Sequence, residues 1–232
     1  MTTTALAPAG MPERVRHVVG EHVTRLQRGY LADESHAVAA LARLRRGAGK
    51  EPHQVPDLLG LIDTGLLYGP LPSGWAPREE DLTQAEDAVH VALTLWALHQ
   101  QSKSTGMHQP DSRERPLGLG AGVRRLMPAG DIDETVLKRL VRAGTAPHLA
   151  GLAQRLRDIV VLLRREDIAL DYALLADQLY RWQQPGGRDA VRRLWGRSFH
   201  SYQPRQNSQP GAEGTGAVSA STDFDDTVKD AS

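Results

Sequence analysis

ETVLKRLVRAGTAPHLAGLAQRLRDIVVLLR, at residues 134–164, is the stretch that decides the fold. Its apolar residues recur three and four positions apart on both sides of the segment GTAP, and such residues share one face of an α-helix. Gly and Pro between the two halves end one helix and open the next. The stretch therefore predicts two consecutive amphipathic helices, one over Ile132–Arg142 with Asp131 as its cap and one running from Pro147 through Leu163.

The same spacing continues outward through most of the chain, while the alternation of β-branched residues that marks a strand is almost absent. This pattern predicts an all-α fold, a helical bundle of about eight to nine helices in two small lobes. The other expected helices run from Pro12 through Tyr30, from an Asp33 cap to Arg46, around Leu58–Leu67, over Glu79–Gln101, around Val123–Leu126, over Tyr172–Gln183 behind an Asp171 cap, and from Val191 through Leu194 and Phe199 to Tyr202.

Composition divides the chain into four segments. Residues 1–11 are expected to be a flexible N-terminus, residues 12–118 an N-terminal helical lobe, and residues 119–203 a C-terminal helical bundle. Residues 204–232 contain almost no large apolar side chains, so a disordered tail is expected, because burial would not offset the entropy of ordering it. The loop SKSTGMHQPDSRERPLG at 102–118 lacks periodicity and is predicted to be exposed and mobile.

Composition also excludes several classes of protein. The chain has 232 residues and no Cys, which removes structural disulfides, thiolate zinc sites and a cysteine nucleophile. No apolar run is long enough to span a membrane, and the first eleven residues lack the basic and apolar regions of a signal peptide. We therefore expect a cytoplasmic protein without membrane contact.

The sequence contains no motif for catalysis or metal binding. Its nine His form no HExxH or HxxxH pair, and His90 and His99 point in roughly opposite directions on one predicted helix. The glycines of PLGLGAG at 116–122 follow no strand and precede no GK[ST], so they indicate a tight turn between helices rather than a phosphate-binding loop. Because GxSxG is absent as well, we expect no enzyme activity, no metal and no cofactor.

Charge is segregated along the chain although its formal net value is 0. Residues 51–100 contain eight acidic residues against one basic residue, Arg78, whereas residues 113–165 contain eleven basic residues against five acidic ones. Of the 28 basic residues, 24 are Arg, whose planar guanidinium suits phosphate contacts. A GC-rich coding bias would explain the excess of Arg equally well, and the same residues could be ordinary surface charges. The separation of the acids from the bases favours a track that contacts phosphates without reading bases.

Several blocks together resemble the CasB family, the small subunit of the type I-E CRISPR surveillance complex Cascade. The similarity covers essentially residues 12–203. It rests on the blocks AVAALARLRRGAG at 37–49, VALTLWALHQQSK at 91–103, RPLGLGAGVRRL at 115–126, the stretch at 134–164, ALDYALLADQLYRW at 169–182 and VRRLWGRSFHSY at 191–202.

This resemblance implies a non-catalytic, all-helical subunit present as two stacked copies among other Cascade subunits. Its basic face would contact the backbones of the crRNA and target DNA, including the displaced strand, and so stabilise the R-loop. The loop at 102–118 matches the family only loosely, which weakens the assignments of Arg113 and Arg115. The nucleic-acid-binding residues that carry over are Arg45, Arg46, Lys103, Arg113, Arg124, Arg125, Arg142 and Arg157.

Two other functions fit the same composition. A stand-alone helical DNA-binding regulator would need a recognition helix that offers polar side chains to base edges, and the sequence shows no such helix. A helical scaffold that touches only proteins would have the same fold without salt-sensitive binding. The aromatic residues Trp182, Trp195 and Phe199 lie on apolar stripes, so we expect them in the core rather than stacked on bases.

Overall fold

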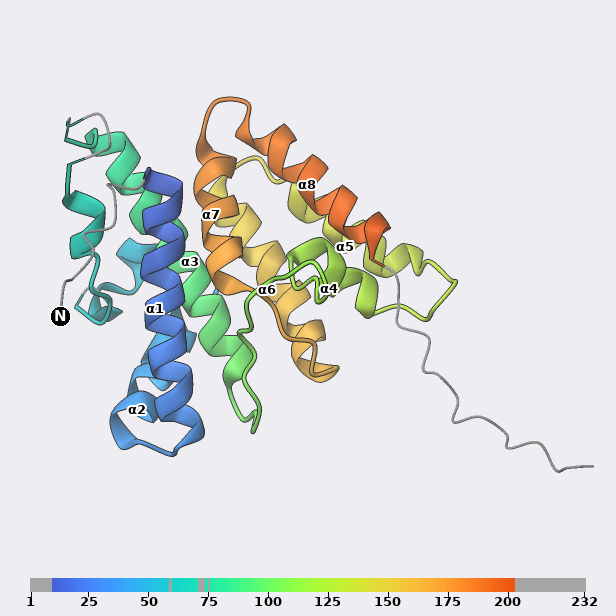
Figure 1. The fold of residues 1–232 in the computed structure, drawn as a ribbon, viewed down its shortest axis with the longest axis horizontal. Coiled ribbons are helices and arrows are strands. Elements are labelled where there is room, and N and C mark those ends of the chain that lie inside the picture. The colour runs from blue at the N-terminus through green and yellow to red at the C-terminus, as the bar shows by residue number, and fades with distance from the viewer. Residues whose placement is uncertain (1–9, 59, 71–73, 75, 203–232) are drawn as a thin grey trace, which may run out of the picture.

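The computed structural model describes residues 10–58, 60–70, 74 and 76–202, and these residues form an all-α protein (Figure 1). The predicted fold class is confirmed. The segments expected to be flexible or disordered lie almost wholly outside the described residues; Met11, assigned to the flexible N-terminus, instead begins the first helix and is buried. The α-helices of the described part are α1 (Met11–Leu31), α2 (Ser35–Leu44), α3 (Glu79–Gln100), α4 (Leu119–Arg125), α5 (Glu134–Gly144), α6 (Leu149–Arg165), α7 (Tyr172–Gln183) and α8 (Gly187–Ser201).

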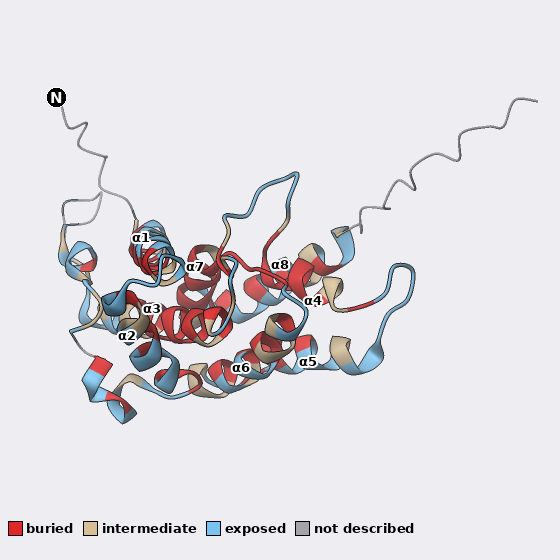
Figure 2. Ribbon diagram, turned by 90° about the horizontal axis from the view of Figure 1, so that it is seen from below, coloured by how far each residue is buried: buried red, intermediate tan, exposed pale blue. Residues whose placement is uncertain are grey.

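Helix α3 lies at the centre of the core. Its residues are buried on nearly every side from Ala85 onward, because α1, α6 and α7 all pack against it. Figure 2 shows this buried layer, with α6 and α5 along one side of the molecule and α8 on the other. Helix α7 contacts α1 and α3 as well as α8, so one connected hydrophobic cluster includes residues from both predicted lobes. The division at residues 118 and 119 stays a prediction.

Three helices begin later than predicted. Asp33 has a left-handed backbone, with φ of 56°, and α2 starts at Ser35 behind Glu34. Helix α5 is capped by Asp133 rather than Asp131, because the Asp133 carboxylate accepts hydrogen bonds from the backbone N–H groups of Thr135 and Val136. The predicted cap is therefore two residues too early, because Asp is a good N-cap residue at both positions and the backbone conformation selects between them.

Helix α6 begins at Leu149, two residues after Pro147. The ring of His148 caps it by accepting a hydrogen bond from the backbone N–H of Gly151 at 3.0 Å. Asp171 caps α7 as predicted, through the N–H of Leu174 at 2.9 Å. A His cap is missed by sequence reasoning because Ser, Thr, Asp and Asn are the usual cap residues.

The short α-helix expected around Leu58–Leu67 is absent. In the described part of this segment the chain forms 3₁₀ turns instead, at Pro52–Gln54, Pro56–Leu58 and Gly65–Tyr68. Pro56 and the glycines leave too few consecutive residues for an α-helix, and Leu66 is half-exposed. Leu59, which falls within the expected helix, lies outside the described part.

The glycine run after residue 116 belongs to a helix rather than to the predicted turn. A side chain at Gly120 would collide with the backbone carbonyl of Trp195 and lie 2.7 Å from the backbone nitrogen of Phe199. Glycine here lets α4 approach the backbone of α8 directly. This close packing was not visible in the sequence, because it requires knowing that α8 lies across α4.

The aromatic residues predicted to be core are buried: Trp182, Trp195 and Phe199 are each at most 2 % exposed. One inward assignment on α8 is wrong, because Leu194 is 40 % exposed. It falls on the edge of the α8 apolar stripe, where a small rotation of the helix decides burial. Tyr202, which follows the end of α8, is partly buried.

Candidate nucleic-acid interface

The 102–118 segment is anchored at both ends, in contrast to the exposed mobile loop that was predicted. Met107, His108 and Leu117 are buried. The side chain of Gln27 holds the first end by accepting a hydrogen bond from the N–H of His108 and donating to its carbonyl, at 2.8 and 3.0 Å. Exposed residues remain on either side of the anchored positions, at Ser102, Ser104 and Thr105 and in a longer turn at 110–115.

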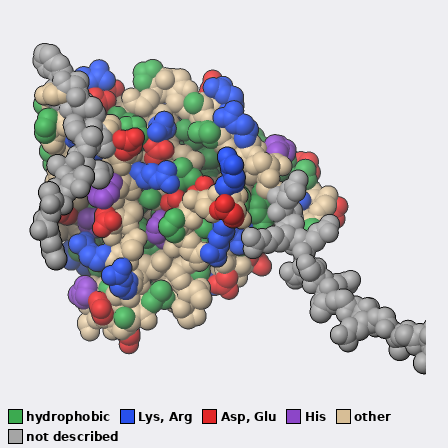
Figure 3. All heavy atoms as spheres, viewed as in Figure 1, with side chains coloured by type: hydrophobic (Ala, Val, Ile, Leu, Met, Phe, Trp, Pro, Cys, Tyr) green, Lys and Arg blue, Asp and Glu red, His purple; other side chains and the backbone are tan. Residues whose placement is uncertain are grey.

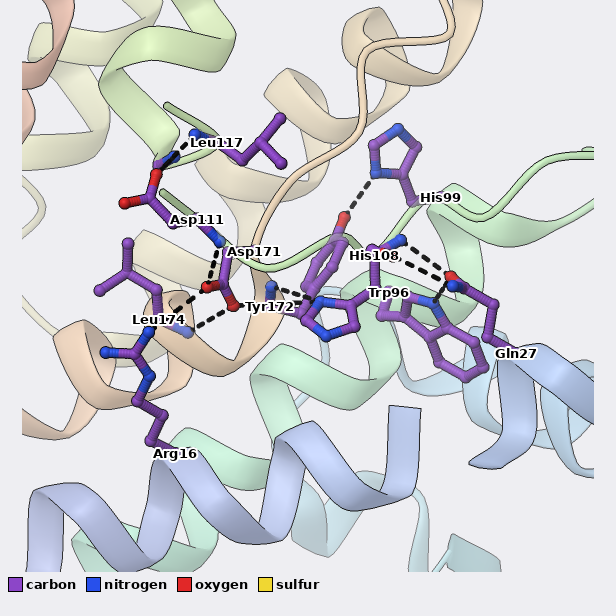
Figure 4. Close-up of polar contacts among 11 residues, drawn as sticks. Arg16, Gln27, Trp96, His99, His108, Asp111, Leu117, Asp171, Tyr172 and Leu174 are labelled. Carbon is purple, nitrogen blue, oxygen red and sulfur yellow. Dashed lines mark hydrogen bonds and ion pairs between the residues drawn. The ribbon is translucent and has the colours of Figure 1, made fainter. Parts of the chain in front are cut away.

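Carboxylates close the base of this turn. The N–H of Asp111 donates to Asp171, and the Asp111 carboxylate accepts from the N–H groups of Leu117 and Gly118, at 2.5 and 2.9 Å (Figure 4). Ser112 and Arg115 are hydrogen-bonded to each other within the turn. These hydrogen bonds therefore fix the base of the turn that carries Arg113 and Arg115.

The network continues inward through neutral histidines. Nδ1 of His108 accepts a hydrogen bond from the N–H of Tyr172 at 3.1 Å, which requires that nitrogen to be unprotonated. Burial lowers the pKa of His108, while the nearby Asp171 carboxylate opposes that effect. Deeper still, burial lowers the pKa of His99 to about 3, and its Nδ1 lies 2.8 Å from the Tyr172 hydroxyl. These groups hold the fold in place and are not available as acids or bases at the surface.

Basic residues from two segments meet at an open groove beside this turn, and a third segment completes its lining. Arg113 and Arg115 come from the turn, Arg125 from the end of α4, and Ser201 with Tyr202 from the end of α8. The groove has a volume of about 370 Å³ and contains one acidic residue, Glu114. Within the described part of the chain, none of its three arginines forms an ion pair.

A stripe of arginines on α8 leads to this groove. Arg193, Arg197 and Ser201 are spaced four residues apart, so they lie on the same face of the helix, and Ser201 lines the groove. Both arginines are exposed. Figure 3 shows basic side chains in a line over α8 toward α4. Arg193 and Arg197 were not among the predicted binding residues, although their spacing was visible in the sequence.

A second group of predicted residues lies around η1 (Arg45–Gly47) and α6. Arg45 and Arg46 are exposed, and the side chain of Arg157 on α6 packs beside Gly49. The Arg46 guanidinium pairs with the Asp57 carboxylate at 2.7 Å. Both partners are about half-exposed, so this pair holds Arg46 only weakly. Arg142, at the end of α5, is exposed, and its carbonyl accepts a hydrogen bond from Arg155 of α6.

The last two predicted residues have local partners. Lys103 is mostly buried and its ammonium lies 2.5 Å from the Asp167 carboxylate. Arg124 is partly buried and donates to the carbonyl of Pro128 at 3.0 Å. Both charges are thus directed toward their own chain rather than toward solvent.

The predicted binding residues lie in two groups on the described surface, and whether both contact nucleic acid stays a prediction. The groove lies where α4, α8 and the 110–115 turn meet, whereas α6 and α5, which carry Arg157 and Arg142, lie along the opposite side (Figure 2). Sequence reasoning could not separate the two groups, because positions 113, 125 and 202 are brought together by the packing of α4 on α8 and by the anchoring of the turn on Asp171.

Other kinds of site are not visible in the described residues. No group of three His, Asp or Glu side chains there could hold a metal ion. His90 contacts the carbonyl of Lys50, and both His90 and His99 are buried. Among the described helices, none is both long enough and apolar enough to cross a membrane.

The fold and this surface define a class: an all-α protein whose exposed arginines gather at a groove and on two helical faces. Residues 40–200 match the model of the family described as CRISPR-associated protein Cse2 (CRISPR_cse2), and this chain belongs to that family. No curated protein sequence matches it.

Two solved structures resemble the chain. The crystal structure of CasB from Thermobifida fusca is 49 % identical, has a TM-score of 0.70, and is matched over 98 % of its own chain and 81 % of this one. The predicted resemblance to the CasB family is thereby confirmed. A chain of a CRISPR RNA-guided surveillance complex is 21 % identical with a TM-score of 0.56, over 93 % of that chain and 80 % of this one. At that identity the second likeness shows the fold alone.

Proposed function

We propose that this chain is the non-catalytic small subunit of a Cascade-type CRISPR surveillance complex and stabilises its R-loop by contacting nucleic-acid backbone. Membership of the Cse2 family and the fold shared with a chain of an RNA-guided surveillance complex support this proposal. The partners in this proposal are crRNA, target DNA with its displaced strand, other Cascade subunits and a second copy of this chain. The complex would act in the cytoplasm.

The observation that carries the backbone contact is the basic surface formed by Arg193 and Arg197 on α8 together with the groove at the end of that helix. Arg193 and Arg197 are exposed, and within the described residues no carboxylate pairs with them or with the groove arginines. A guanidinium without a carboxylate partner among the described residues can bind a phosphate bidentately. Such contacts hold a strand without reading its sequence, as expected where base pairing with a guide supplies specificity.

Backbone contacts also suit the energetics of R-loop formation. Exchanging a DNA duplex for an RNA–DNA duplex is nearly balanced, so modest contacts to the strands tip the equilibrium. Each phosphate contact releases condensed counterions, which makes the affinity fall as salt rises. The proposed function thus predicts salt-sensitive, sequence-indifferent binding.

The test is a filter-binding titration of the full chain with single-stranded DNA across a series of salt concentrations. We expect log Kd to depend linearly on log salt, and Arg193→Ala with Arg197→Ala to flatten the slope by about 1.4, at about 0.7 per contact on a single strand. Arg46→Ala with Arg142→Ala tests the face on α6 and α5 in the same way, with an expected flattening of about one to two units if both contact a backbone.

Arg78→Ala is the control. Arg78 is exposed, precedes α3 in the acidic stretch and already pairs with Asp81 at 2.9 Å, so its replacement should leave the slope unchanged. In the assembled complex, the α8 double variant should shorten the lifetime of the R-loop more than it slows target recognition. Salt-independent or absent binding by the wild-type chain would favour a scaffold that touches only proteins, and a strong preference for one duplex sequence would favour a DNA-binding regulator.

A further inference from the structure

The C-terminal segment that follows the described residues begins at the wall of the basic groove. Tyr202, the last described residue, lines the groove together with Arg113 and Arg125. The family match ends at residue 200, so the segment lies beyond the part of the chain that the family model describes. The segment therefore starts next to three arginines that lack a carboxylate partner in the described part of the chain.

The charge of this segment is opposite to that of the groove. Residues 203–232 contain five acidic residues and two basic ones. Three of the five acids flank a single aromatic residue in the sequence DFDD at 223–226. Closely spaced negative charges beside an aromatic ring are also the chemical features of a short single strand, which offers phosphates and bases.

The surface around the groove offers a complement to the negative charges of the segment and another to its aromatic ring. Next to the arginines lies a second hollow of about 260 Å³, lined by Met127, Ile168, Glu166, Arg125 and Tyr202. Arg125 and Tyr202 are therefore shared between a basic hollow and a partly apolar one. An aromatic ring next to carboxylates could use both hollows at once, with its ring against Tyr202 and its charges on the arginines.

The segment is long enough to reach this position. Twenty residues separate Tyr202 from Asp223. At the scaling of Gly- and Ser-rich linkers, a chain of that length spans about 25 Å on average. A tether of this kind raises the effective concentration of the attached group to the millimolar range.

We propose that the DFDD segment at 223–226 docks in the groove of Arg113, Arg115 and Arg125 and competes there with nucleic-acid backbone. The competition would be strong enough to suppress weak, non-specific binding and weak enough for an R-loop to displace the segment. The proposal rests on the proposed function only for the competing ligand, because docking itself involves this chain alone.

The first experiment measures the competition. Fluorescence anisotropy with a labelled oligodeoxythymidylate compares the full chain with a chain truncated after Tyr202. A contact with a dissociation constant of about 0.1–0.5 mM, at an effective concentration of about 1 mM, weakens competing binding about threefold to tenfold. We therefore expect truncation to tighten the Kd by that factor at about 50 mM salt, and by less at 200 mM, where screening shortens the range of the attraction.

Charge-matched variants separate docking from a general effect of negative charge. Asp225→Asn with Asp226→Asn should reproduce most of the truncation effect, whereas Glu213→Gln with Asp230→Asn removes the same number of charges and should change the Kd less than twofold. Replacing Arg113, Arg115 and Arg125 by Ala should make truncation ineffective, because the shared site is gone. Equal effects of the two Asn/Gln pairs, or no effect of truncation on a chain that does bind DNA, would overturn the proposal.

The second experiment needs no nucleic acid. Because the chain has no Cys, Ser221→Cys provides a unique attachment point for a spin label. We expect paramagnetic broadening of the backbone amide signals of Arg113, Arg115 and Ser201, and loss of this broadening in the variant with three arginines replaced. Unchanged amide signals in this turn would overturn docking. A chain that shows the broadening yet binds no DNA would contradict the proposed function and leave docking supported.

Discussion

Trp195 joins the last two helices through one hydrogen bond and a buried ring, and its replacement tests that joint quantitatively. Its side chain is 2 % exposed, and its Nε1–H donates to Gln178 Oε1 on α7 at 2.7 Å. Trp195→Phe keeps most of the ring but leaves the buried Gln178 oxygen without this donor, which costs about 1–3 kcal/mol. Trp195→Ala also removes the ring, and large core truncations of this kind cost about 3–5 kcal/mol.

Trp182 supplies a matched control. It is equally buried, but its Nε1–H finds no acceptor among the described residues. Trp182→Phe therefore removes an unsatisfied donor instead of a hydrogen bond. We expect Trp195→Phe to lower the free energy of unfolding by about 1–3 kcal/mol more than Trp182→Phe does.

The assay is urea unfolding of the full chain, followed by circular dichroism. The comparison holds if the dependence of the unfolding free energy on urea is the same for both variants. In a thermal scan, Trp195→Ala should lower the melting temperature by roughly 6–20 °C, at about 2–4 °C per kcal/mol for a chain of this size. Equal losses for the two Phe variants would refute the assigned hydrogen bond. Weaker DNA binding by Trp195→Ala with unchanged stability would instead make Trp195 a stacking residue.

Three further predictions follow from the packing, the titration and the end of the core. Gly120→Ala should destabilise the protein by about 1–3 kcal/mol in urea unfolding, because the added methyl group meets the α8 backbone, whereas Gly196→Ala on the open side of α8 should be neutral or stabilising. Burial lowers the pKa of His99 to about 3 in the folded protein, whereas the pKa in the unfolded chain is ordinary, so the free energy of unfolding should fall as the pH drops below about 6.5. This group should contribute up to about 1.4 kcal/mol per pH unit to the fall. His99→Gln should flatten that part of a curve of stability against pH, and an unchanged curve would contradict the assignment. Truncation after Gln203 should leave the melting curve unchanged, because the buried core ends at Phe199, and a cooperative loss of stability would show that the segment contributes to the fold.

The site divides into a part that sequence reasoning found and a part that it missed. Arg113 and Arg125 were predicted, and both line the groove. Lys103 was predicted too, but it lies mostly buried against Asp167, a residue 64 positions away that no local pattern connects to it. Arg193 and Arg197 were not predicted, because the predicted residues followed the family resemblance and not the spacing of four residues that places both arginines on one face of α8.

The sequence by itself determined most of the helical segments and most of the residues buried on them; the expected helix around Leu58–Leu67 and the inward assignment of Leu194 are exceptions. Those properties follow from spacings of three and four residues, so a short window contains the information, as Val15 and Val19 on α1 or Leu152 and Leu156 on α6 illustrate. Helix starts were less certain where two cap residues competed, as at Asp131 and Asp133.

Only the tertiary structure decided which arginines act together. Gly120 brings α4 against the backbone of α8, and this contact places Arg125 beside Tyr202 and the 110–115 turn. Asp171, at the start of α7, fixes the base of that turn from 60 residues away. Such contacts depend on how whole helices cross, which is set by the sum of many packing interactions across the core and not by any local pattern in the chain.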